Sequence, residues 1–235
     1  EPQDVEVVRA LLPPAHVLAD KIEGDVAYLR VPTFEAGKAN EIREKLMQFD
    51  RQGTHKLVLD LRDCGRGEAS EAVAVARLFV SSGTISSLRG QTVAKQEFAA
   101  DSSKVVWKYP MTVLISGSTT GPAEVVAAGI GGNRRGDLVG TRTFGSASEQ
   151  KLIPLDNGAA LVLTVAEYYT PAGKAIPEDG VMPTVEVRAG NGDQADLGDE
   201  EAPPRPGGQP PASREDPVLR KALELLKGEA RRAAA

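Results

Sequence analysis

Short apolar runs alternate along the chain with longer stretches whose apolar residues recur at helical spacing. The short runs are rich in β-branched residues and are typical of buried strands, whereas the longer stretches predict helices with one apolar face. Three strand and helix pairs are predicted, at residues 24–34 and 35–49, 56–62 and 68–80, and 111–117 and 122–130. A further strand is predicted at 138–144. This alternation favours an α/β fold with a mixed, mainly parallel sheet flanked by helices.

The pattern changes after residue 150. Two β-rich runs within 151–171 flank an Asp-Asn-Gly sequence at 156–158. Because Asn and Gly tolerate positive φ, this arrangement predicts an antiparallel hairpin. Residues 189–216 are rich in Gly, Pro and acidic side chains, which predicts a linker or mobile loop.

A helical pattern returns at 217–228, with Pro217 suited to the first turn. Its apolar stripe consists of Leu219, Leu223 and Leu226. Such a stripe needs an apolar partner, which either this chain or another copy can supply.

The composition excludes several functional classes. With 235 residues, 41% of them hydrophobic, the chain is long enough to bury a sizeable core. A net charge of −5, a pI of about 5.3 and scattered Lys and Arg argue against a nucleic-acid partner. Cys64 is the single cysteine and cannot form a disulfide within the chain. Because the sequence has only two histidines, His16 and His55, we expect no metal site, and we expect no cofactor. The sequence has no run of about 18 apolar residues that would predict a membrane span, and its first residues lack the pattern of a signal peptide.

One stretch is a candidate for chemistry. Residues 115–126 read ISGSTTGPAEVV and place the hydroxyls of Ser118, Thr119 and Thr120 directly before a predicted helix. A hydrolase can hold a nucleophile at such a turn. The simpler interpretation is a helix N-terminus, with a hydroxyl or glycine cap and Pro122 at the first helical position.

Six segments, in this order, carry a resemblance to a known family: GDVAYLRVPTF, KLVLDLRDCGRG, MTVLISGSTTGPAEVVAAGI, LVGTRTFGSASEQKLIPLDNGAALVLTVAEYYTPAGKAI, GVMPTVEV and DPVLRKALELLKG. They resemble the C-terminal processing (tail-specific) peptidases, which form serine peptidase family S41. The resemblance covers residues 18–188 and the C-terminal helix, and YYTPAGKAI followed by GVMPTVEV is its most specific part. It implies a crotonase/Clp-peptidase-like spiral of strands and helices, in agreement with the alternation of strands and helices.

The resemblance also implies a serine nucleophile that a neutral lysine activates as the base. When the alignment is anchored on Glu124 and on the Thr-Phe-Gly of 143–145, the nucleophile position falls on Gly121 and the lysine position on Ser146. Gln150 matches a glutamine that assists the lysine in the family. Glycine has no nucleophilic side chain and a serine hydroxyl is no general base near neutral pH, so the dyad is degenerate.

Two functions remain open on these residues. The first is a catalytically inactive domain that acts as a binding module for unfolded or extended polypeptide, such as C-terminal tails, or as a scaffold. In the segment that contains Cys64, the family resemblance implies two adjacent glycines at an oxyanion-binding turn, and Arg66 stands in place of one of them. A side chain at this position restricts φ and adds bulk, which weakens the backbone approach expected of such a turn. The alternative is an active serine-type endopeptidase with a relocated nucleophile. The candidates for that nucleophile are Ser118, Thr119, Thr120, Ser146 and Cys64.

The resemblance also predicts how the chain is organised: 1–17 as the remnant of a preceding PDZ domain and connector, 18–188 as the peptidase-like core, 189–216 as the linker and 217–232 as the C-terminal helix. It implies an extracytoplasmic location, in the bacterial periplasm or envelope, with the targeting segment outside this chain. The resemblance also implies that the chain assembles either with further copies of itself, as a homo-oligomer, or with an active relative, which an inactive subunit would regulate.

Overall fold

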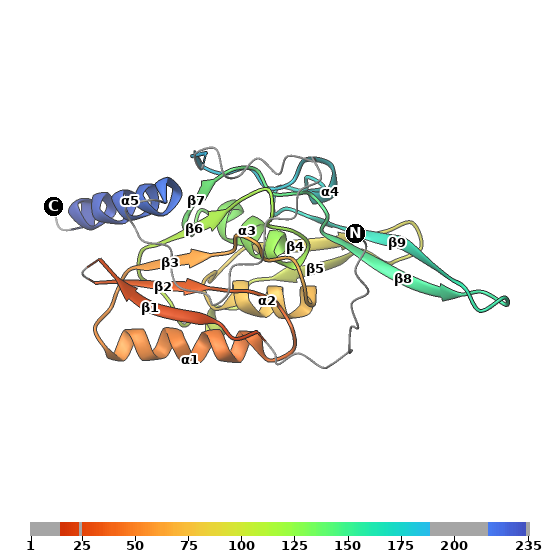
Figure 1. Cartoon of the computed structure of the whole chain (residues 1–235), viewed down its shortest axis with the longest axis horizontal. Helices are drawn as coiled ribbons and strands as arrows, with labels where there is room; N and C mark the ends of the chain where they lie inside the picture. Colours follow the sequence, from red (N-terminus) through yellow and green to blue (C-terminus); the bar gives the residue numbers. More distant parts are fainter. Residues whose placement is uncertain (1–14, 24, 189–215, 234–235) are drawn as a thin grey trace, which may run out of the picture.

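The computed structural model describes residues 15–23, 25–188 and 216–233, which form two β-sheets with helices packed against them (Figure 1). Most of the connector predicted at 1–17 and of the linker predicted at 189–216 lies outside the described residues. The strands are β1 (Leu18–Ile22), β2 (Val26–Arg30), β3 (Leu57–Asp60), β4 (Thr84–Arg89), β5 (Gln96–Ala99), β6 (Met111–Ile115), β7 (Asp137–Gly140), β8 (Ser148–Pro154), β9 (Ala160–Tyr169) and β10 (Val185–Glu186). The helices are α1 (Lys38–Arg51), α2 (Ala69–Arg77), α3 (Pro122–Gly132), α4 (Ile176–Asp179), α5 (Pro217–Ala233) and the 3-10 helix Ser102–Lys104.

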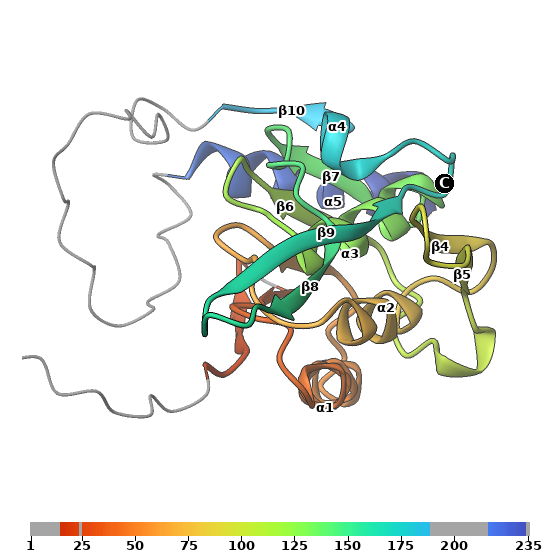
Figure 2. The ribbon, with the colours of Figure 1, turned by 90° about the vertical axis from the view of Figure 1, so that its right-hand side faces the viewer.

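The larger sheet has the strand order β1-β2-β3-β6-β7-β10 and is parallel except for β1, which pairs antiparallel with β2. Its central strands β3 and β6 are buried at every position and mostly apolar, because both faces of this sheet are covered. Neighbouring residues of a strand point to opposite faces, so Leu57 and Leu59 join the core with α1, α2 and α3, whereas Val58 packs against α5. Figure 2 shows α5 and α1 on opposite sides of this sheet. The α/β fold with a mainly parallel sheet is confirmed.

The second sheet has the order β5-β4-β9-β8 and is antiparallel. The predicted hairpin is confirmed as β8 and β9, and Gly158 in its turn has a φ of 82°. This hairpin extends away from the rest of the molecule (Figure 1). Strand β4 was not predicted, because its sequence TISSLR carries two serines. Ser86 is nevertheless buried, and its hydroxyl donates to the carbonyl oxygen of Tyr169 at 2.7 Å.

The strand predicted at 138–144 is wrong in its second half, because β7 ends at Gly140. Gly140 has a φ of 133°, and a Cβ atom there would lie 2.0 Å from the carbonyl oxygen of Ile115. Glycine therefore lets the chain leave the extended conformation at this point, and residues 141–147 form a loop beside α3. Among the described helices, none combines the length and apolar character that a membrane span requires.

Candidate functional site

The turn between β6 and α3 has an unusual backbone. Gly121, directly before the helix, has φ 51° and ψ −118°, a combination that residues with a side chain rarely adopt. A Cβ atom at Gly121 would lie 3.3 Å from the carbonyl oxygen of Gly65 and meets no closer atom. The position therefore has room for a small side chain but imposes backbone strain on it.

Glu124 joins this turn to the loop 141–147. Its carboxylate is fully buried and accepts four hydrogen bonds. One oxygen, Oε2, accepts from the N–H groups of Gly121 at 2.9 Å and Ser146 at 2.8 Å. The other, Oε1, accepts from the N–H of Gly145 at 2.7 Å and from the hydroxyl of Thr143 at 2.5 Å. A buried carboxylate with this many donors holds two segments in one fixed arrangement.

This arrangement brings Gly121 and Ser146 together. The N–H of Gly121 donates to Ser146 Oγ at 3.2 Å as well as to Glu124. The two predicted dyad positions are thus in contact across 25 residues of sequence, but they contribute only a backbone N–H and a hydroxyl. Pro122 follows and has no N–H, so the first residue of α3 cannot donate to a developing oxyanion. Sequence reasoning missed this consequence, although the proline itself is visible there.

Gln150 is the third site residue that the family resemblance predicts. It is exposed on β8, opposite Thr164 on β9 and just beyond an irregularity in the pairing of the two strands. Within the described residues, no hydrogen bond joins its side chain to Gly121 or Ser146.

Of the three hydroxyl candidates before α3, Thr119 stabilises the turn. Thr119 is fully buried, and its hydroxyl is hydrogen-bonded to two backbone groups at 3.0 Å. Thr120 places its hydroxyl against Gly65, where a Cβ atom would lie only 1.8 Å from it. Ser118 is exposed. In the described part of the chain, no hydrogen bond connects any of these hydroxyls to a lysine or a histidine.

Cys64 is fully buried after β3. Burial, together with the negative charge of Asp60, raises the pKa of its thiol to about 12. The group is therefore a neutral thiol near pH 7 and a poor nucleophile.

The turn that contains Arg66 keeps a close backbone approach. Gly67 has a φ of 115°, and a Cβ atom there would lie 2.1 Å from the carbonyl carbon of Phe34. Arg66 itself is exposed, while its carbonyl oxygen accepts from the N–H of Phe34 at 2.7 Å. The arginine side chain thus adds no bulk to the interior of the turn.

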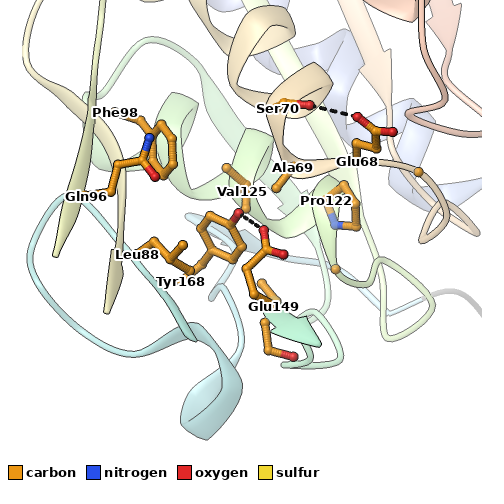
Figure 3. A pocket seen from close by; sticks show the side chains of 14 residues that line it. Glu68, Ala69, Ser70, Leu88, Gln96, Phe98, Pro122, Val125, Glu149 and Tyr168 are labelled. Atoms are coloured by element: carbon orange, nitrogen blue, oxygen red, sulfur yellow. Dashed lines mark hydrogen bonds between the residues drawn. The ribbon is translucent and has the colours of Figure 1, made fainter. Parts of the chain in front are cut away.

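A cavity of about 470 Å³ opens beside Gly121 (Figure 3). It lies between the N-terminal ends of α2 and α3 and the strands β4, β5, β8 and β9. Two carboxylates line it, from Glu68 and Glu149, and the hydroxyl of Tyr168 donates to Glu149 at 2.5 Å. Sequence reasoning missed this site, because its residues come from segments far apart in the chain. Within the described residues, no group of three or more His, Cys, Asp or Glu side chains could hold a metal ion.

Comparison with known proteins gives one consistent family. The sequence model described as peptidase family S41 matches residues 25–187. The chain is 33% identical over 192 residues to the carboxy-terminal-processing protease of Bartonella bacilliformis, covering 80% of this chain and 44% of that protein. It is 31% identical over 181 residues to the chloroplastic C-terminal processing peptidase of Tetradesmus obliquus, covering 77% of this chain and 38% of that protein.

A solved structure agrees with these sequences. The photosystem II D1 C-terminal processing protease is similar with a TM-score of 0.64 and 31% identity, over 69% of this chain and 42% of that one. The chain thus spans 38% to 44% of the length of these three relatives.

Proposed function

Because the chain belongs to peptidase family S41, we propose that it is a pseudo-peptidase domain of the C-terminal processing type, which binds unfolded or extended polypeptide without cleaving it. The observation that carries the proposal is the contact between Gly121 and Ser146, in which a backbone N–H donates to a hydroxyl. Neither group can attack a carbonyl with help from the other, since the pair has no general base. The missing N–H of Pro122 supports the same conclusion.

Polypeptide capture needs no dyad. In the described part of the chain, β8 is an edge strand of its sheet, so an extended segment could pair with its free backbone groups. The relatives are named for processing carboxyl termini, which makes C-terminal tails the first ligands to test. The same proposal includes a preceding PDZ domain, an extracytoplasmic location in the bacterial periplasm or envelope, and assembly with itself or with an active relative.

The alternative is an active endopeptidase with a relocated nucleophile. It requires a base within about 3.2 Å of a hydroxyl or thiol, directly or through one water. Thr119 is committed to backbone groups, and Cys64 is a buried neutral thiol. These contacts favour the inactive domain over the alternative.

The test compares cleavage of an unstructured protein with binding of fluorescent peptides derived from its C-terminus. We expect the wild-type chain to bind peptides and to leave the protein intact. We expect Gly121→Ser with Ser146→Lys and Pro122→Ala to gain slow cleavage, because this combination supplies a nucleophile, a base and an N–H. Each single substitution is the matched control and should stay inactive. The proposal would be overturned in favour of the alternative if the wild-type chain cleaved the protein and if Thr120→Val or Cys64→Ala abolished that cleavage.

A further inference from the structure

We infer that the cavity beside Gly121 receives a lysine or arginine side chain of the bound polypeptide. The inference rests on the proposed peptide-binding function and names the residue type that this site selects. Gly121 is itself part of the cavity wall. A peptide that passes over the turn before α3, where Figure 3 labels Pro122, would therefore direct one side chain into the cavity.

The charge of the cavity points to a cation. Glu68 and Glu149 are the only charged residues among those that line it. Each uses one oxygen internally: Glu149 Oε1 accepts from Tyr168, and Glu68 Oε2 accepts from the hydroxyl of Ser70 at 3.1 Å. In the described part of the chain, the second oxygen of each carboxylate has no hydrogen bond, and neither glutamate forms an ion pair. Two carboxylates therefore have acceptor capacity left for a ligand.

The apolar part of the cavity wall suits a long aliphatic stem. Leu88 and Val125 are buried apolar residues at the cavity, and the rings of Phe98 and Tyr168 lie 6.1 Å apart, tilted toward one another. Figure 3 shows Tyr168 between Leu88 and Glu149, so the apolar surface continues up to a carboxylate. Lysine and arginine each combine an apolar stem with a cationic head group. The stem matches the apolar wall, and the head group matches the carboxylate at its end.

Other occupants fit less well. An acidic side chain would face two like charges, and a purely apolar one would remove water from the carboxylates without replacing the lost hydrogen bonds. A metal ion would find only these two carboxylates, since the described residues hold no larger group of ligands. The partial positive charge at the start of α3 opposes a cation, but the carboxylate of Glu124 already compensates it from within the first turn.

Tyr168 supports this arrangement. Burial and its hydrogen bond to Glu149 both raise the pKa of the phenol above its usual value. The phenol therefore remains a donor at neutral and mildly alkaline pH, and it holds Glu149 at the apolar wall with one oxygen left for a ligand.

Binding of three fluorescent peptides to the wild-type chain tests the inference. The peptides are unstructured and identical except at one central position, which carries Lys, Met or Glu. We expect the Lys peptide to bind about tenfold more tightly than the Met peptide and the Glu peptide to bind most weakly, with a preference that shrinks as salt is added. Equal affinities for all three would overturn the inference and leave the proposed function intact. Binding of none would overturn both.

Charge-neutral variants then locate the preference. Glu68→Gln and Glu149→Gln should each reduce the Lys-over-Met ratio several-fold while binding of the Met peptide is kept. Glu44→Gln, an exposed glutamate on α1 away from the cavity, is the matched control and should keep the wild-type ratio. Glu68 is also exposed, so its variant is expected to fold normally. A Lys preference that survives both cavity substitutions together would overturn the inference.

Discussion

At the residue scale, the contact between Gly121 and Ser146 depends on Glu124. Its buried carboxylate is the common acceptor for the turn before α3 and for the loop 141–147. Gly121 and Ser146 meet because both donate to it. The relative position of these two residues is thus held by a third residue, Glu124.

Replacing this carboxylate tests that role. Glu124→Gln should lower the free energy of unfolding by about 2–4 kcal/mol, because the amide NH₂ would face buried donors and leave them unpaired. Urea unfolding followed by far-UV circular dichroism measures the loss. Glu44→Gln, the same change at an exposed position, should alter stability by less than about 0.5 kcal/mol. Equal stabilities of the two variants would contradict this account.

Cys64 gives a second prediction at this scale. With the pKa of its thiol raised to about 12, only about one molecule in ten thousand carries the reactive thiolate at pH 8. Alkylation of the native chain by iodoacetamide should therefore be much slower than that of the urea-unfolded chain. The raised pKa also means that this group stabilises the fold below the unfolded pKa near 9, and that its contribution is lost as pH rises toward 12. Rapid labelling of the native chain at pH 8 would show an accessible, activated thiol instead.

At the element scale, α5 is attached to the large sheet by charge as well as by apolar contact. Asp216 caps the helix, since its side chain accepts from the N–H groups of Val218 and Leu219 at 3.0 Å. It also accepts from Arg62 at 2.8 Å, and Arg62 in turn pairs with the fully buried Asp60. Burial alone would lower the pKa of the Arg62 guanidinium, but the two carboxylates outweigh it and raise that pKa.

Two substitutions at Asp216 separate the cap from the ion pair. Asn caps helices about as well as Asp, so Asp216→Asn should remove the charge interaction alone, whereas Asp216→Ala removes both. We expect Asp216→Ala to be the more destabilising by about 1 kcal/mol. Differential scanning calorimetry of the two variants and the wild type measures the order. Equal losses would mean that the cap contributes nothing.

At the scale of the whole molecule, the two sheets differ in how they are covered. The six-stranded sheet has helices on both faces, and one of these faces supplies the apolar partner that the leucine stripe of α5 requires. The β8–β9 hairpin extends into solvent with apolar side chains exposed, Leu152 being 64% exposed. The described part of the chain therefore has an apolar cluster on each face of the six-stranded sheet and a hairpin that projects from them.

A pair of identical substitutions contrasts these environments. Leu223→Ala should cost about 2–4 kcal/mol of stability, because Leu223 is only 2% exposed between α5 and the sheet and its removal leaves a cavity. Leu152→Ala on the hairpin should change stability by less than about 0.5 kcal/mol. Chemical unfolding of both variants at several protein concentrations makes the comparison. A small effect of Leu223→Ala would mean that α5 does not pack on this sheet in solution.

Much of the fold could be predicted from local pattern. The strand and helix pairs and the hairpin turn depend on residue spacing and on the φ preferences of Asn and Gly, which the sequence displays directly. Strand β4 could not be predicted, because the serines that obscure its pattern are buried by a partner strand far along the chain. The predicted strand was longer than β7, because the bend at Gly140 depends on its close approach to Ile115 of β6, which the sequence does not display.

By itself the sequence determined which chemical groups are present: glycine and serine at the two positions that the family resemblance assigns to a dyad, a proline after the first, and a single cysteine. Only the tertiary structure decided what those groups face. Burial of Cys64 depends on residues distant in the chain, as do three of the four hydrogen bonds to Glu124 and the meeting of two carboxylates at one cavity. Hydrogen bonding and desolvation depend on the neighbours in space, and no local pattern encodes them.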